Sequence, residues 1–211
     1  MSLLIYGPIS TLIHRCVSTK RPQGILLTFD DGPDPRYTPK LLDLLDEYQV
    51  KALFFALSRK VLRYPELARD IEARGHQLAL HGAYHLNAWR ASPKQVRQNI
   101  SLGIRQFRRM GFNPMLFRPP FGRVNLFHES PLPVLYWTKL FYDWNSQSKD
   151  HLVHAMKKRS APGEIFLLHD GTEARAVEGM PLVMIEALRE WLFWAHSVGI
   201  HISDGGRWPN E

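Results

Sequence analysis

Several polar side chains that can bind a metal ion or transfer a proton follow directly after short apolar runs. They are Asp30, Asp31, His81, Arg118, Asp143 and His169. Each has a structural alternative when it is taken alone: Asp30-Asp31-Gly32-Pro33 can be only a turn, and Arg118-Pro119-Pro120 can be an exposed bend. Chance does not readily place all of them at the ends of apolar runs, so the pattern predicts one shared site.

His81 and His85 have the most specific spacing. Residues four apart on a helical turn lie on the same face, which brings both imidazoles within reach of one ion. With one carboxylate from the Asp30-Asp31 pair they form a set of two histidines and one carboxylate, which leaves coordination positions open for water. This set favours zinc, while cobalt, nickel or iron can use similar ligands. His151 and His154 also share a helical face, but no apolar strand leads to them, and we interpret them as solvated.

Asp30 and Asp31 are adjacent, and their carboxylates would raise each other's cost of ionisation in a semi-enclosed site. A bound cation relieves this conflict. Because neighbouring side chains diverge, one carboxylate can bind the metal while the other faces the water that the metal activates and takes its proton. These residues therefore predict a metal-dependent hydrolase with one of the two aspartates as general base.

The elements that position these residues alternate between apolar runs and helical segments. The predicted strands cover residues 25–29, 52–57, 77–80, 115–117, 134–140, 165–168 and 200–202. The predicted helices begin near residues 38, 65, 92, 151 and 181. About seven βα units favour an α/β fold with a distorted TIM-like (β/α) barrel over an open doubly wound sheet. Barrel enzymes assemble their chemistry at the C-terminal ends of the strands, where the polar residues stand.

The amino-acid composition and net charge limit the domain organisation and the kinds of partner. The 211 residues are 45% hydrophobic and 22% charged, which suits a single domain over residues 1–211 with a real core. Within it we expect an N-terminal extension over 1–24 and a catalytic region over 25–203. The net charge of +7 favours an anionic partner, but the basic residues are scattered, so we expect no nucleic-acid partner. The single cysteine, Cys16, excludes an intrachain disulfide.

Five ordered motifs resemble those of the polysaccharide deacetylases of carbohydrate esterase family 4, the NodB-homology group, over about residues 25–203. The motifs are Thr28 to Pro33, His81 to His85, Arg118 to Gly122, Asp143-Trp144 and Leu167 to Asp170. The resemblance implies that Asp30 is the base, that Asp31, His81 and His85 bind the metal, and that His169 is the general acid.

The same resemblance implies supporting roles for five further residues. Arg118 would orient the base, the Phe121 backbone N–H would contact the oxyanion, and Asp143 would help to orient the site. Trp144 and Leu167 would wall the acetyl pocket. The chain departs from the family pattern in two places: Gly82 replaces the usual serine or threonine after the first histidine, and Leu140 replaces an aspartate three residues before the fourth motif.

The expected activity is removal of N-acetyl groups from N-acetylglucosamine units of a glycan, with peptidoglycan-type material ahead of chitin. Other hydrolases remain open: a deformylase or deacetylase of a lipid-linked sugar, or a xylan O-acetyl esterase. From other classes, the alternatives are an inactive carbohydrate-binding protein and a non-haem iron oxygenase, whose cosubstrate signature we do not find.

The expected partner is the acetylated glycan, and we expect the chain to be a monomer. Such a substrate indicates the cell envelope or a secreted protein. The apolar start of the sequence lacks a basic segment before it and is interrupted by Gly7-Pro8, so we expect neither a signal peptide nor a transmembrane segment in this chain.

Overall fold

The computed structural model describes residues 21–125, 130–173 and 176–206. Cys16, the Gly7-Pro8 segment and most of the expected extension over 1–24 lie outside these residues. The centre of the described fold is a sheet of five parallel strands in the order β3-β2-β1-β5-β4. The strands are β1 (Leu26–Asp30), β2 (Leu53–Ala56), β3 (Gln77–Leu80), β4 (Lys139–Leu140) and β5 (Ile165–His169).

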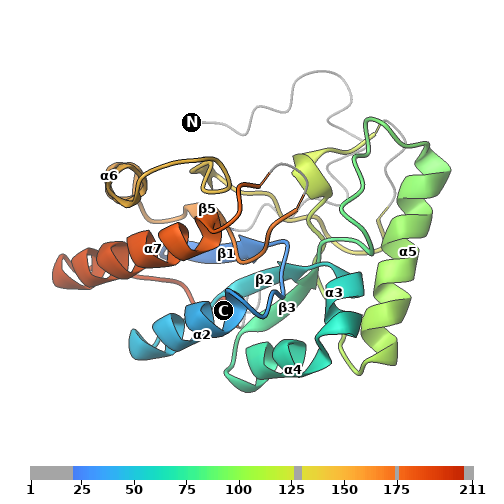
Figure 1. The fold of residues 1–211 in the computed structure, drawn as a ribbon, viewed down its shortest axis with the longest axis horizontal. Helices are drawn as coiled ribbons and strands as arrows, with labels where there is room; N and C mark the ends of the chain where they lie inside the picture. Colours follow the sequence, from blue (N-terminus) through green and yellow to red (C-terminus); the bar gives the residue numbers. More distant parts are fainter. Residues whose placement is uncertain (1–20, 126–129, 174–175, 207–211) are drawn as a thin grey trace.

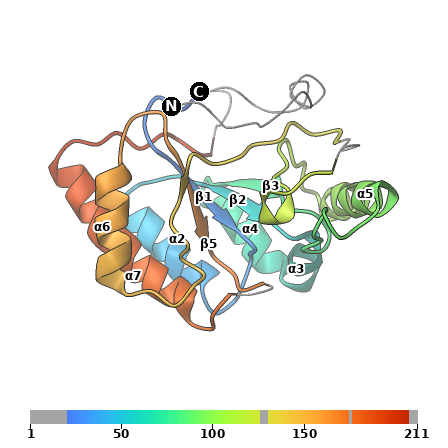
Figure 2. The same ribbon diagram turned by 90° about the horizontal axis from the view of Figure 1, so that it is seen from above.

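Six α-helices accompany the sheet within the described residues. They are α2 (Thr38–Glu47), α3 (Ser58–Arg63), α4 (Pro65–Ala73), α5 (Pro93–Arg109), α6 (Lys149–Arg159) and α7 (Met180–Ser197). α6 and α7 lie at one end of the molecule and α5 at the opposite end (Figures 1 and 2). The predicted start of α5 is confirmed, because Ser92 and Gln95 form a reciprocal capping box ahead of Pro93.

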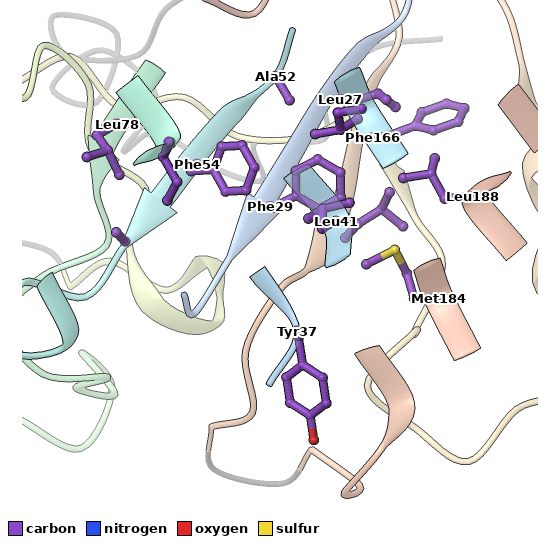
Figure 3. Packing of buried hydrophobic residues seen from close by; sticks show 14 of the residues in the cluster. Leu27, Phe29, Tyr37, Leu41, Ala52, Phe54, Leu78, Phe166, Met184 and Leu188 are labelled. Carbon is purple, nitrogen blue, oxygen red and sulfur yellow. The ribbon is translucent and has the colours of Figure 1, made fainter. Parts of the chain in front are cut away.

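Side chains on the two faces of the sheet alternate between two apolar clusters. Leu27 and Phe29 of β1 pack toward Leu41 of α2 and Leu188 of α7 in the larger cluster (Figure 3). The intervening Leu26 belongs to a smaller cluster on the other face. That cluster contains Leu26, Leu53, Phe55, Ala79, Leu116, Leu135 and Ile165. Leu116 and Leu135 thus pack on the second face, as the inner wall of a distorted barrel does.

The expected α/β class is confirmed, but the expectation of about seven strands is only partly met. Residues 117 and 134 join the sheet edge through single bridges, Leu80 to Phe117 and Phe117 to Val134, and Ile25 makes a further bridge to Ile202. The barrel is not closed within the described residues. Prolines at positions 114, 119, 120, 131 and 133 explain this, because each lacks the N–H that a strand ladder needs.

Candidate active site at the strand ends

The end of β1 places Asp30 beside the end of β5. Asp30 pairs in register with His169, so the strand ladder itself sets these two residues next to each other at the C-terminal edge of the sheet. Arg118 holds the Asp30 carboxylate, with Nη1 donating to Oδ1 at 2.8 Å. Asp30 and Arg118 are both buried, so each compensates the desolvated charge of the other.

Arg118 is fully buried and donates to four oxygens around it. Besides Asp30, it donates from Nη1 to the Thr28 hydroxyl at 2.7 Å and from Nε to the Leu135 carbonyl at 3.0 Å. Nη2 lies 3.4 Å from the Tyr136 carbonyl. The guanidinium carbon stands 4.0 Å from the centre of the Phe55 ring, where it adds a cation–π contact. These contacts fix the arginine in one orientation beside Asp30.

Asp31, His81 and His85 converge on one point. Oδ1 of Asp31 lies 3.4 Å from Nε2 of His81 and 3.3 Å from Nε2 of His85, and the three candidate ligand atoms lie within 4.8 Å of one another. The Asp31 oxygen is buried and has no hydrogen-bond partner in the described structure. A buried carboxylate oxygen facing two imidazole nitrogens fits a divalent cation.

The protonation states of these three side chains also fit a site for a divalent cation. Burial lowers the pKa of His81 and of His85 to about 3, so both imidazoles are neutral at pH 7 and can donate a lone pair. Nδ1 of His81 lies 2.8 Å from the Arg118 carbonyl, which makes Nδ1 the protonated nitrogen and leaves Nε2 for a metal. Burial raises the pKa of Asp31 to about 7, a cost that a bound cation would remove.

The two histidines lie on a loop after β3, and the expected helical turn is absent from residues 81–85. Gly82 adopts a φ of 98°, and a Cβ there would come within 2.7 Å of Nδ2 of Asn99. Asn99 on α5 braces the loop by accepting from the Tyr84 N–H at 2.9 Å and donating to the Tyr84 carbonyl at 3.0 Å. The side-chain amide of Asn99 therefore supports this loop, in which Gly82 lacks the hydroxyl of the serine or threonine that is usual in the family.

His169 is paired with Asp143. Oδ1 of Asp143 lies 2.9 Å from Nδ1 of His169, and Oδ2 accepts from the His169 backbone N–H at 2.8 Å. Burial alone would lower the pKa of His169, but the charge of Asp143 and the hydrogen bond to it outweigh burial and raise the pKa to about 9. The imidazole is thus protonated at pH 7. Leu140 has no carboxylate, so the carboxylate that pairs with His169 comes from Asp143.

Trp144, Leu167 and Phe121 stand around these groups. The Trp144 ring lies 4.9 Å from the His169 ring, and the Phe121 ring lies 4.4 Å from the His85 ring. Leu167 is buried on β5, two residues before His169. Phe121 has a φ of 59° in the short 3-10 turn η1 (Pro120–Gly122), so its backbone is turned sharply beside a candidate metal ligand. The structure therefore brings all ten predicted site residues to one edge of the sheet.

Replacing Asp143 with asparagine should shift the pH dependence of hydrolysis. Activity that needs protonated His169 falls as pH rises through the pKa of that histidine. Loss of the Asp143 charge lowers this pKa, so the alkaline fall in kcat should move to lower pH, by roughly 1–3 units. Profiles of kcat against pH for Asp143→Asn and for a control at the exposed Asp150, Asp150→Asn, would check this. An unmoved alkaline limb would rule out the pairing as the cause.

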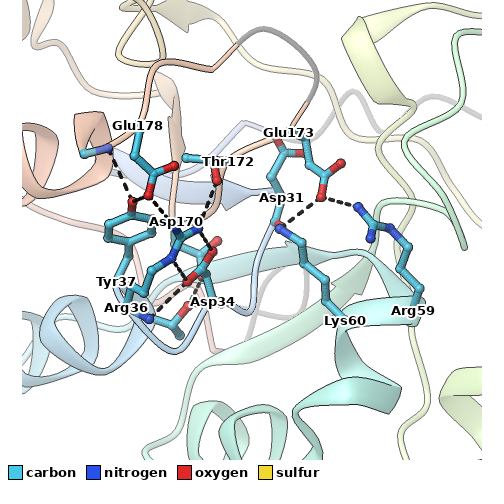
Figure 4. A network of polar contacts seen from close by, with 12 residues as sticks. Asp31, Asp34, Arg36, Tyr37, Arg59, Lys60, Asp170, Thr172, Glu173 and Glu178 are labelled. Carbon is cyan, nitrogen blue, oxygen red and sulfur yellow. Dashed lines mark hydrogen bonds and ion pairs between the residues drawn. The ribbon is translucent and has the colours of Figure 1, made fainter.

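Lys60 is a residue of the site that no motif indicates. This lysine of α3 is buried, and its Nζ donates to the Asp31 backbone carbonyl at 2.8 Å and pairs with Glu173 at 3.0 Å (Figure 4). Arg59 pairs with the same carboxylate. Asp31 has a φ of 76°, an uncommon conformation for a residue other than glycine, so it depends on such support. Lys60 and Glu173 therefore hold the candidate metal ligand Asp31 in place.

We expect Lys60→Met to weaken metal binding about 10–100-fold, the usual effect of removing a group that orients a ligand. The control is Lys51→Met, which removes a lysine paired with Asp46 at 3.0 Å and far from the site. Affinity would be measured by competition with a chelator, and the unfolding temperature of the metal-free proteins would be compared. Equal metal affinity in Lys60→Met and the parent protein would show that Asp31 needs no such support.

The geometry defines the class of protein: an α/β sheet whose strand ends carry a candidate site for one metal ion, with a buried carboxylate and an imidazolium beside it. The sequence pattern of the polysaccharide deacetylase family matches residues 18–128, about half of the chain. A peptidoglycan-N-acetylglucosamine deacetylase of Bacillus cereus is 36% identical over 159 residues, which are 72% of this chain and 75% of that protein. The chain therefore belongs to the polysaccharide deacetylase family, as its motifs predicted.

Two further relatives agree. A chitooligosaccharide deacetylase of a Bradyrhizobium species is 33% identical over 156 residues, which are 71% of this chain and 71% of that protein. The crystal structure of the peptidoglycan N-acetylglucosamine deacetylase Bc1960 superposes with a TM-score of 0.81 at 26% identity, over 93% of this chain and 94% of that one. These relatives are hydrolases that cleave amide bonds.

Proposed function

We propose that this protein removes N-acetyl groups from N-acetylglucosamine units of a glycan, with peptidoglycan-type material preferred over chitin. One observation carries the proposal: Asp30 and His169 stand side by side at the strand ends next to the three candidate metal ligands, and they offer a carboxylate and a protonated imidazole. Hydrolysis of an amide needs both a proton acceptor and a proton donor. A binding module needs neither.

Asp31, His81 and His85 would hold the metal, for which we propose zinc, with cobalt, nickel or iron as alternatives. A divalent ion at this position supplies a Lewis acid for the carbonyl and lowers the pKa of water. Asp30, oriented by Arg118, accepts the proton of the attacking water. The Phe121 backbone N–H stabilises the oxyanion. His169, oriented by Asp143, then donates its proton to the departing sugar nitrogen, which leaves as a free amine, while the acyl group leaves as acetate.

Trp144 and Leu167 would line the pocket for the acetyl methyl group. Both side chains are apolar, and Trp144 packs against the ring of the acid His169. A small apolar pocket accepts a methyl group and excludes bulkier acyl groups.

We propose, from the substrate, that the protein acts in the cell envelope or outside the cell. Among the described residues, none of the helices has the length and apolar character that crossing a bilayer requires. We propose that the catalytic region covers residues 25–203 and that the protein acts as a monomer, which light scattering after size-exclusion chromatography would check.

An acetate-release assay tests the proposal directly. The metal-stripped protein, and the same protein with zinc restored, would be incubated with N-acetylated peptidoglycan fragments, chitin oligomers, acetylated xylan and a formylated lipid-linked sugar. We expect metal-dependent acetate from the first two. If only the xylan or the lipid-linked sugar were hydrolysed, the proposed substrate would be wrong, while the proposed hydrolase activity would stand. Glycan binding without any turnover would indicate a carbohydrate-binding protein.

A further inference from the structure

A row of side chains leads away from the metal ligands along one side of the site. The Phe121 ring lies 4.4 Å from the His85 ring, and the guanidinium carbon of Arg123 lies 5.3 Å from the centre of the Phe121 ring. The same carbon lies 4.3 Å from the centre of the Trp89 ring. The row is therefore continuous from a metal ligand to Trp89, and the proposed reaction uses only the backbone of Phe121 within it.

Trp89 is exposed and yet held in one orientation. The residue is 69% exposed, while its indole N–H donates to the Val124 carbonyl at 3.2 Å and its backbone N–H donates to Oδ1 of Asn87 at 3.0 Å. The indole hydrogen bond joins the loop after β3 to the chain after η1. A large aromatic face that is fixed in position and open to solvent, next to an active site, is typical of a binding surface.

Arg123 supplies a positive charge at the same place. Its guanidinium carbon lies over the Trp89 ring, and within residues 21–125, 130–173 and 176–206 no acidic side chain forms an ion pair with it. The edge of a guanidinium matches a carboxylate with two parallel hydrogen bonds. The row thus combines a flat apolar face with an anion-binding edge.

We propose that Trp89 and Arg123 form a subsite for the sugar unit next to the one that is deacetylated. Trp89 stacks on the C–H face of that sugar ring, and Arg123 pairs with a carboxylate that the sugar or its substituent carries. This inference rests on the proposed function and makes it more specific: among acetylated glycans, the site selects carboxylate-bearing, peptidoglycan-type chains over neutral, chitin-type chains of the same length.

The test compares three single variants of the metal-loaded full chain with the parent protein: Trp89→Ala, Arg123→Gln and Arg123→Lys. Phe193→Ala is the control, because Phe193 is 70% exposed on α7 and lies outside the row. The substrates are two tetrasaccharides, one neutral and one bearing carboxylates. Initial rates give kcat and KM, and calorimetry measures binding of the deacetylated products, which does not depend on turnover.

Trp89→Ala should raise KM and weaken product binding roughly tenfold for both tetrasaccharides, the effect of losing one aromatic contact. Arg123→Gln should raise KM mainly for the carboxylate-bearing tetrasaccharide, and Arg123→Lys should keep most of the preference because it keeps the charge. Phe193→Ala should match the parent protein for both tetrasaccharides.

Several results would overturn the inference. Equal KM and binding in Trp89→Ala and Phe193→Ala would exclude the stacking contact, and an equal loss for both substrates in Arg123→Gln would exclude the carboxylate contact. If the parent protein released no acetate but its glycan binding still depended on Trp89 and Arg123, the subsite would stand and the deacetylase proposal would fall. If it neither bound nor hydrolysed either tetrasaccharide, both would fall.

Discussion

Asp30→Asn should retain its metal and lose most hydrolysis, with kcat falling on the order of 10²–10⁴-fold. Asparagine keeps the shape of the side chain, and its amide oxygen can still accept the hydrogen bond that Arg118 donates at 2.8 Å. It cannot accept a proton from water at neutral pH. The measurements are steady-state acetate release and elemental analysis of the purified variant.

Folding must be checked in the same variant, because the substitution leaves the fully buried Arg118 without its counter-charge. Breaking such a pair costs on the order of 3–5 kcal/mol, so we expect a lower unfolding temperature. The comparison is therefore made well below that temperature, where both proteins are folded by circular dichroism. Near-normal turnover by a folded, metal-loaded variant would place the base elsewhere.

A variant that carries both His81→Ala and His85→Ala should lose its metal and, with it, essentially all hydrolysis. Two of the three ligand atoms disappear, and Asp31 alone is a weak site for a divalent ion. The double variant His151→Ala, His154→Ala is the matched control, because both of these histidines are exposed on α6. Metal content per chain by elemental analysis gives the answer. One metal per chain in the His81, His85 double variant would refute the site.

Prediction from the sequence succeeded for elements whose structure depends on residues that are close together along the chain. The buried run of β1 and the two aspartates after it are consecutive, so a strand that ends in acids could be predicted directly. Val96, Ile100, Ile104 and Phe107 recur at the spacing of one helix face, and the structure buries these four side chains in α5. In both cases local periodicity is the physical cause of the structure.

Interactions between distant residues could not be predicted in this way. Lys60 contacts the carbonyl of Asp31 across 29 positions, and Asn99 braces Tyr84 across 15. Neither residue has a distinctive motif. The short helix α3 also escaped prediction, because it has only six residues and ends just before Pro65. In the proline-rich stretch around residues 114–133, apolar runs suggested strands that the backbone cannot complete with hydrogen bonds.

The contacts of Arg118 have a consequence for assembly of the molecule. Its guanidinium joins Thr28 and Asp30 of β1 to the carbonyls of Leu135 and Tyr136, across the part of the barrel where prolines interrupt the strand ladder. The arginine thus connects β1 to residues 135 and 136, and the same side chain orients the proposed base. A chain in which this connection has not formed consequently has no oriented Asp30.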